Sequence, residues 1–190
     1  MTNIGLRWRS FWAARIAVSA ALAGVTAALA ACDPTSAKMP ERNPAEAGRT
    51  MTAVIDEVVR NLPRKPKGHP EVGFQFCDTG LNSEKQVRPM ANDPWHVRYN
   101  VYSVGSGLVY SVSSYAESEQ VFRTLTDRLR SAGGWELKDV RLTSGAYGGF
   151  RGKKNGVSVV TMTGPTGPGG VDGLEATIRF DAGCFKHPHA

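Results

Sequence analysis

Residues 174–181 read Leu-Glu-Ala-Thr-Ile-Arg-Phe-Asp and carry the clearest strand signal in the chain. Every second residue from Leu174 to Phe180 is apolar, and the residues between them are polar or charged. Successive side chains of a strand point to opposite faces, so this alternation predicts a strand with one face buried and the other in water. The segment therefore indicates a half-buried antiparallel sheet.

Other segments rich in β-branched and aromatic residues complete the predicted sheet. We expect further strands over residues 72–77, 95–101, 108–113, 137–142, 147–151 and 157–163. Residues 95–101 alternate apolar with polar side chains and predict a second half-buried strand. The stretch Gly105-Ser106-Gly107 is interpreted as a hairpin turn, and Asn155-Gly156 is typical of a type I′ hairpin.

The first predicted helix begins at Asn43-Pro44. Asparagine is a favoured N-cap, and proline fits the first helical position. Pro63 ends the helix. Apolar residues at helical spacing form one stripe, which favours packing on the sheet: Met51, Val54, Ile55, Val58, Val59 and Leu62.

The second predicted helix begins at Ser114. Glu117 follows three residues later and completes the capping-box pattern, and Gly133-Gly134 ends the helix. Its apolar face comprises Val121, Phe122, Leu125, Leu129 and Ala132.

These elements predict an α+β fold: an antiparallel sheet of about six or seven strands with two helices packed on one face. We expect a single domain over residues 43–190. Residues 32–42 are polar, contain two prolines and show no apolar periodicity, so they predict a flexible tether.

Residues 1–31 have the anatomy of a secretory signal peptide. They contain three arginines and no acidic residue, and residues 16–31 form a continuous run of apolar or small side chains. A spanning helix needs about 20 apolar residues, which makes an uncleaved membrane anchor the less favoured alternative.

The run closes on Leu29-Ala30-Ala31-Cys32, which resembles a bacterial lipobox. Cys32 would then be the first residue of the mature chain and the site of lipid attachment. The attached acyl chains would include palmitate. Two or more acyl chains anchor a protein stably to a membrane, whereas one does not. Ordinary signal cleavage that leaves Cys32 as a free thiol is the second alternative.

Two cysteines remain once Cys32 is set aside. Cys77 and Cys184 in an exported chain predict one disulfide bond, because exported proteins meet an oxidising environment. Two unrelated buried thiols are the alternative.

The net charge gives no support to nucleic-acid binding. The full chain carries a formal charge of +6, and three of its positive charges lie in the signal peptide, so the mature chain is only weakly basic. No nucleic-acid partner is predicted.

No catalytic, metal or cofactor motif stands out. The spacing Cys184-x-x-His187-x-His189 would allow metal coordination, but Cys184 is already predicted to form the disulfide bond. His96 near Asp93 could form an acid–base pair, although a lone histidine there is more often a surface residue.

Two further patterns are weaker still. Residues 164–170 are glycine-rich but lack the Lys-Ser/Thr of a phosphate-binding loop. Aromatic residues that could form the floor of a ligand site are more often core: Trp95, Tyr99, Tyr102, Tyr110 and Trp135. We therefore expect no enzyme activity, no cofactor and no resident metal.

The order of features resembles the small exported lipoproteins of mycobacteria and related actinobacteria, of the LppA-like kind. The lipobox at Cys32, the first helix and Cys77 carry the resemblance, with the second helix followed by Gly134-Trp135 and the closing Gly183-Cys184-Phe185. The resemblance implies a cell-surface lipoprotein with no settled biochemical role.

The predicted function is that of a lipid-anchored envelope lipoprotein with a non-enzymatic binding or interaction role. It would lie on the extracytoplasmic face of the cell membrane, held there through Cys32, with a protein or lipid partner that the sequence does not identify. The alternative is a carrier of lipid or another apolar ligand in a cavity between sheet and helices.

Overall fold

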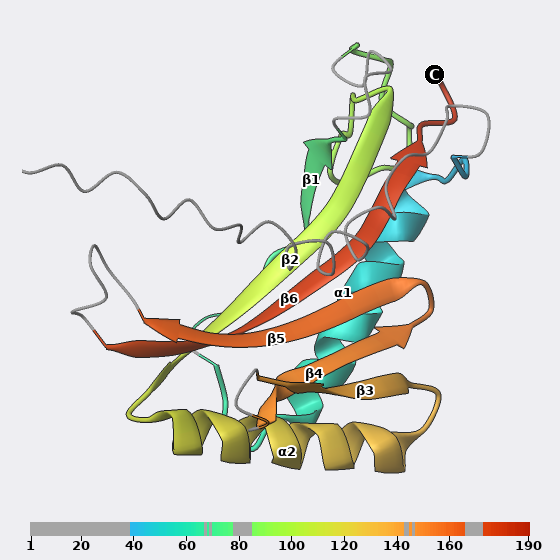
Figure 1. The fold of residues 1–190 in the computed structure, drawn as a ribbon. Helices are drawn as coiled ribbons and strands as arrows, with labels where there is room; N and C mark the ends of the chain where they lie inside the picture. Colours follow the sequence, from blue (N-terminus) through green and yellow to red (C-terminus); the bar gives the residue numbers. More distant parts are fainter. Residues whose placement is uncertain are drawn as a thin grey trace, which may run out of the picture. The chain divides into compact units, whose positions relative to one another are not determined.

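The computed structural model describes residues 39–66, 68, 70–77, 85–142, 145, 147–165 and 173–190. Its elements follow in the order α1 (Pro44–Asn61), β1 (Gly73–Phe76), β2 (Val101–Val112), α2 (Tyr115–Ala132), β3 (Glu136–Arg141), β4 (Tyr147–Lys154), β5 (Val157–Pro165) and β6 (Leu174–Lys186). The strands of this part of the chain form one antiparallel sheet in the order β1-β2-β6-β5-β4-β3 (Figure 1). The predicted α+β class is confirmed.

Both helices begin at the predicted caps. The Asn43 side chain accepts a hydrogen bond from the backbone N–H of Ala45 at 2.9 Å. The Ser114 hydroxyl accepts one from the N–H of Glu117 at 3.1 Å, while the Glu117 carboxylate accepts from the N–H of Ser113. The second half of this capping box therefore reaches one residue further back than the usual pattern.

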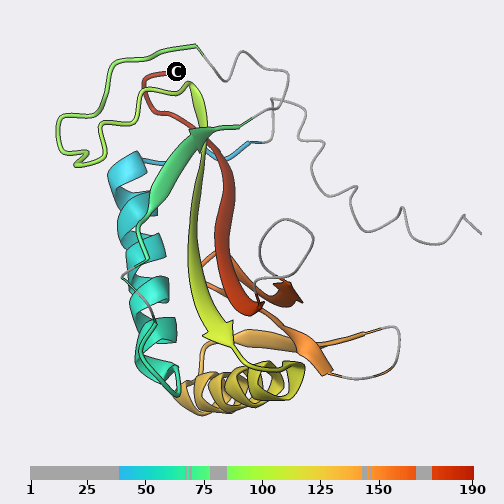
Figure 2. The ribbon, with the colours of Figure 1, turned by 90° about the vertical axis from the view of Figure 1, so that its left-hand side faces the viewer.

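The apolar stripes of both helices pack into one buried cluster on one face of the sheet. α1 lies along β2 and β6, and α2 lies against β4 (Figure 2). The largest fully buried side chains include Tyr102 from β2, Phe122 from α2 and Phe150 from β4. Within the described residues, no helix has both the length and the hydrophobicity that a membrane-spanning segment needs.

The strand predicted over residues 95–101 is wrong, as is the hairpin at Gly105-Ser106-Gly107. β2 runs without a turn from Val101 to Val112, and both glycines lie within it. The pairing of β2 with β6 shifts register between Ser103 and Gly105, and a Cβ at position 105 would lie 3.3 Å from the Phe180 carbonyl oxygen. Glycine thus allows close approach of the neighbouring strand.

Residues before β2 form a folded loop instead of a strand. The Asp93 carboxylate accepts hydrogen bonds from the N–H groups of Trp95 and Val97, at 3.0 and 2.6 Å. His96 between them has a φ of 52°, which no β-strand contains. The alternation over residues 95–101 arose because Trp95 and Val97 both pack against the core from this loop.

The hairpin predicted at Asn155-Gly156 is confirmed. It joins β4 to β5, and the two residues have φ values of 51° and 80°. A type I′ turn requires positive φ at both central positions, which asparagine and glycine tolerate.

Candidate functional site

The predicted disulfide between Cys77 and Cys184 is confirmed. Cys77 follows β1 directly and Cys184 lies in β6, so the bond joins the two strands that flank β2, with the two Cα atoms 6.0 Å apart. It closes a sequence separation of 107 residues. Cys32, the predicted lipid-attachment residue, lies outside the described residues, as do residues 166–172 of the glycine-rich segment.

Asp93 and His96 do not form the acid–base pair that was considered. The Asp93 carboxylate is buried and already accepts the two backbone hydrogen bonds of its loop, whereas His96 is exposed. The histidine whose pKa is affected by the charge of Asp93 is His187, which is fully buried. Sequence reasoning missed this neighbour because 94 positions separate the two residues.

The residues of the Cys-x-x-His-x-His pattern make structural contacts. Cys184 is in the disulfide, and His187 Nδ1 accepts a hydrogen bond from the N–H of His189 at 3.0 Å. His189 Nδ1 lies 2.7 Å from the carbonyl oxygen of Arg88. Burial and the nearby His189 hold the pKa of His187 below its ordinary value, against the opposing effects of a hydrogen bond to the Val97 backbone and of the Asp93 carboxylate.

The aromatic residues considered as a ligand floor serve mainly the core. Tyr102 and Tyr110 are buried, and their hydroxyls donate to the carbonyl oxygens of Arg42 and Arg64, at 2.8 and 3.3 Å. Burial raises the pKa of both tyrosine hydroxyls, which therefore stay protonated as donors. Their role is to bind loop backbone to the sheet.

Two open pockets lie at the margins of the helical layer. One, of about 350 Å³, is lined by Thr52 and Ile55 of α1 together with Val72 and Trp95. The other, of about 210 Å³, lies between the start of α2 and β4 and is lined in part by Tyr115, Phe122, Tyr147 and Thr163. Ligand sites for small molecules usually span about 300–1,000 Å³, so both are at or below the small end of that range.

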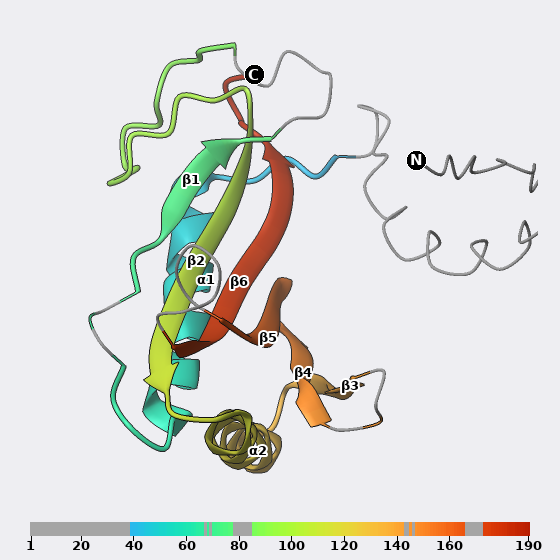
Figure 3. The same ribbon diagram turned by 60° about the vertical axis from the view of Figure 1, so that its left-hand side comes forward.

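The face of the sheet opposite α1 carries the strongest candidate surface. Figure 3 shows α1 behind β2 and β6, with the other face of these strands turned toward the viewer. Among the described elements, no helix packs on that face. Polar side chains of the strands lie on this face, and the residues between them are buried on the other. Phe150 and Gly152, on either side of Arg151, are examples.

Three cations on this face lie in one row across four strands. Lys138 of β3 is opposite Arg151 of β4, which is opposite Val160 of β5, which is opposite Arg179 of β6. We call Lys138, Arg151 and Arg179 the cationic row. All three are exposed, and within the described part of the chain none of them forms an ion pair.

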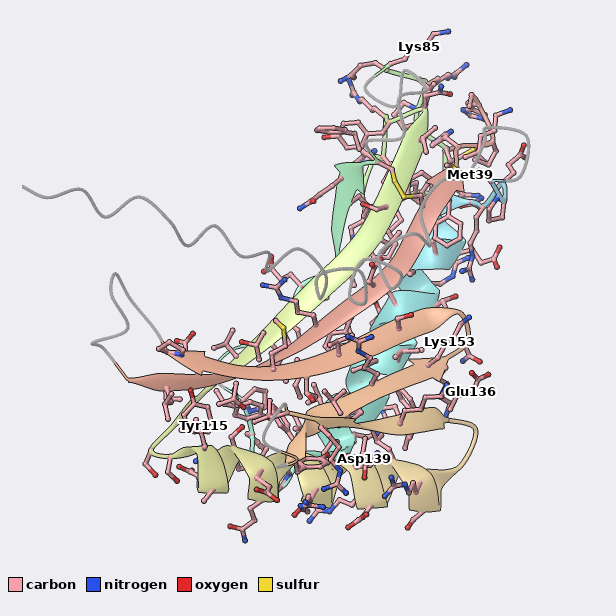
Figure 4. The ribbon with its side chains drawn as sticks, viewed as in Figure 1. Met39, Lys85, Tyr115, Glu136, Asp139 and Lys153 are labelled. Atoms are coloured by element: carbon pink, nitrogen blue, oxygen red, sulfur yellow. A yellow bond between two sulfur atoms is a disulfide. The ribbon has the colours of Figure 1, made fainter. Side chains whose placement is uncertain are left out.

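The rows on either side of the cationic row differ from it in charge. On one side Glu136 lies opposite Lys153, and Asp181 lies opposite Ser158. Figure 4 marks Glu136 and Lys153 at the same end of the β3–β4 pair. The row with these four residues is called the mixed row.

On the other side of the cationic row the face is apolar. Met162 and Val109 lie on either side of Thr177, opposite it on the neighbouring strands, and their side chains are 42% and 41% exposed. We call Val109, Met162 and Thr177 the apolar row. The next residue of β6 on this face is Glu175. Three of the cations on this face thus lie in one row, and Lys153, in the mixed row, lies opposite Glu136.

The sequence contains a signal for each cation but not for the row. Strand alternation places Arg151 and Arg179 on solvent-facing positions, as the buried neighbours of each show, and pairing with Arg151 puts Lys138 on the same face. Their alignment depends on strand register. Lys138 and Arg151 are 13 residues apart in the sequence, and Arg151 and Arg179 are 28 apart, so only the pairing of the strands brings them into one row.

No protein-family model, curated protein or solved structure matches this chain.

Proposed function

We propose that this chain is a lipid-anchored envelope protein with a non-enzymatic binding role. In this proposal residues 1–31 are removed as a signal peptide, Cys32 carries the lipid, and the α+β domain lies on the extracytoplasmic face of the cell membrane. The resemblance to small actinobacterial lipoproteins points in the same direction.

The observation that carries this proposal is how the three cysteines are used. The disulfide joins Cys77 to Cys184, and the remaining cysteine is Cys32, directly after Leu29-Ala30-Ala31. Disulfides persist in exported proteins and are rare in reducing compartments, which supports export. A lipobox accounts for a cysteine that has no partner of its own in the sequence.

The binding role is supported by the surface and not by a catalytic group. The aspartate and the three histidines considered for chemistry make structural contacts or, in the case of His96, lie exposed with no carboxylate partner among the described residues. The open face of the sheet, by contrast, groups unpaired cations beside exposed apolar side chains.

Metabolic labelling with a palmitate analogue tests the anchoring. The wild-type chain is expected to be labelled and Cys32→Ala is expected to lose the label. A Cys77→Ala/Cys184→Ala variant is the matched control, because it removes cysteines but leaves the lipobox intact, and it is expected to keep the label. Equal labelling of wild type and Cys32→Ala would contradict the proposal.

A further inference from the structure

We infer that the cationic row is a binding site for an extended polyanionic chain of the phosphodiester kind. The inference rests on the proposed binding role and names the class of partner.

The first argument is the cost of placing like charges together. Lys138 and Arg151 are directly opposite each other on neighbouring antiparallel strands, an arrangement that destabilises a sheet. The same two strands carry the favourable alternative two residues away, where Glu136 faces Lys153. The sheet thus has a pair of opposite charges at one position and a pair of like charges at the next position on the same face. Such a local conflict is of the kind found at functional sites.

The second argument is the shape of the positive region. Adjacent strands lie about 4.8 Å apart, so the row from Lys138 to Arg179 crosses three such steps and spans about 14 Å. It is one residue wide at β3 and β6, because Asp181 lies two residues from Arg179 on the same strand and face, and Glu136 lies two residues from Lys138. At β4 the neighbouring residue on this face is Lys153, which lies opposite Glu136.

These acids select against a broad anionic partner. A flat anionic membrane laid on the sheet would approach Glu136, Asp181 and Glu175 as well as the cationic row and Lys153, and the three acids would repel it. Among the charged residues of this face, a narrow chain lying along the cationic row contacts only the three cations. Charge complementarity therefore favours a linear polyanion over a membrane surface.

The third argument concerns the chemistry between the cations. Val160 lies in the middle of the row, and Met162 and Val109 lie in the apolar row beside it. Among these side chains only the weak thioether acceptor of Met162 is present, and the hydroxyl of Thr177 between Met162 and Val109 is the one strong acceptor of the apolar row. The N–H groups of an acidic peptide would gain few partners here, whereas a phosphodiester chain has only acceptors on its anionic groups. Its apolar links would contact Val160 and Met162.

The residue types fit phosphate groups. The guanidinium groups of Arg151 and Arg179 each present a planar fork of donors that binds a phosphate through two hydrogen bonds, and Lys138 adds a point charge. Since none of the three is held in an ion pair within the described residues, each is available to a ligand.

Binding of fluorescently labelled poly(glycerol phosphate), a phosphodiester polymer with carbon links, to the full chain in non-ionic detergent tests the inference, with anisotropy read at physiological ionic strength. Arg151→Gln and Arg179→Gln are each expected to weaken binding roughly tenfold, and the triple variant with Lys138→Gln is expected to abolish it. Lys153→Gln is the matched control: it removes one positive charge from the same strand and face, but opposite Glu136, and is expected to change affinity less than about twofold.

Equal weakening by Lys153→Gln and Arg151→Gln would overturn the inference, because it would show attraction to overall charge. So would the absence of any effect at the row. Polyglutamate or anionic vesicles are tested in the same way, and binding of either through the row more tightly than poly(glycerol phosphate) would overturn the assignment to a phosphodiester chain. Lipid labelling of Cys32 is independent of all these outcomes, so failure of anchoring and failure of this site are distinguishable.

Discussion

Lys154 of β4 donates a hydrogen bond from Nζ to Oε1 of Glu57 on α1 at 2.7 Å, across 97 residues of sequence. The indole Nε1 of Trp135 donates to the same carboxylate oxygen at 2.9 Å. Burial works against ionisation of Glu57, but the hydrogen bonds from Lys154 and Trp135 outweigh it and lower the pKa of the carboxyl. This cluster fastens α1 to the β4 side of the sheet.

Glu57→Gln is expected to lower the free energy of unfolding by about 1–3 kcal/mol, because Lys154 loses its charged partner in a site where both side chains are less than one-fifth exposed. Urea unfolding measures the change. Glu119→Gln is the matched control, since Glu119 pairs with Arg123 on the exposed side of α2, and its cost is expected to stay below about 0.5 kcal/mol. Equal costs for the two variants would contradict the structural role of Glu57.

Gly48→Ala is expected to destabilise the fold by about 1–3 kcal/mol, although alanine usually stabilises a helix interior relative to glycine. A Cβ at position 48 would lie too close to three carbon atoms of the Trp95 indole. Thermal unfolding of Gly48→Ala in the wild-type and Trp95→Ala backgrounds checks the cause. In the second background the substitution is expected to become neutral or stabilising, and an unchanged cost there would rule out the steric explanation.

Stability is expected to fall as the pH drops below about 6.5, with His187 as a contributor. Its folded-state pKa is lowered, so the unfolded chain binds the proton first and acid favours unfolding. The contribution of His187 to stability is fully present at pH values above its pKa in the unfolded chain. It is lost as the pH falls toward its lower pKa in the folded protein. His187→Asn keeps an acceptor near the Nδ1 position and is expected to flatten this slope in chemical unfolding.

His96→Asn is the matched control for this pH dependence. His96 is exposed and has a left-handed backbone that asparagine tolerates, so the slope is expected to persist. A slope that disappears in His96→Asn and remains in His187→Asn would reverse the assignment.

Replacing both disulfide cysteines with alanine is expected to cost up to about 4–5 kcal/mol in unfolding free energy, because the bond closes a loop of more than 100 residues in the unfolded chain. Removing both thiols avoids leaving one unpaired. Urea unfolding of Cys77→Ala/Cys184→Ala against wild type gives the difference. A cost near zero would mean that the bond constrains the unfolded chain very little.

The sequence predicted the features that local rules specify. Asn43, Ser114 and Gly133 mark helix ends through hydrogen bonds within a few residues, and Asn155-Gly156 specifies its turn by its own backbone preferences. The disulfide followed from counting cysteines in a chain that the sequence predicts to be exported.

The features that sequence reasoning missed depend on distant packing. Residues 95–101 imitate a strand because Trp95 reaches α1 from a loop that Asp93 organises. Burial of His187 requires residues at the end of β6 to meet Asn100, to which its N–H donates at 2.9 Å. The cationic row exists only once register is set, and alternation alone cannot supply register between separate strands.

The strand β6 also bears on how the domain would respond to tension. Its last residue, Lys186, forms a parallel bridge with Glu41, where the chain leaves the proposed tether, and Arg179 lies seven residues earlier in the same strand. Under a pull between a polymer held at Arg179 and a membrane anchor, load would pass along β6 to the backbone hydrogen bonds that join Lys186 to Pro40 and Arg42. Because β2 and β5 are hydrogen-bonded to its two edges, the strand would have to shear many bonds at once instead of peeling away one bond at a time.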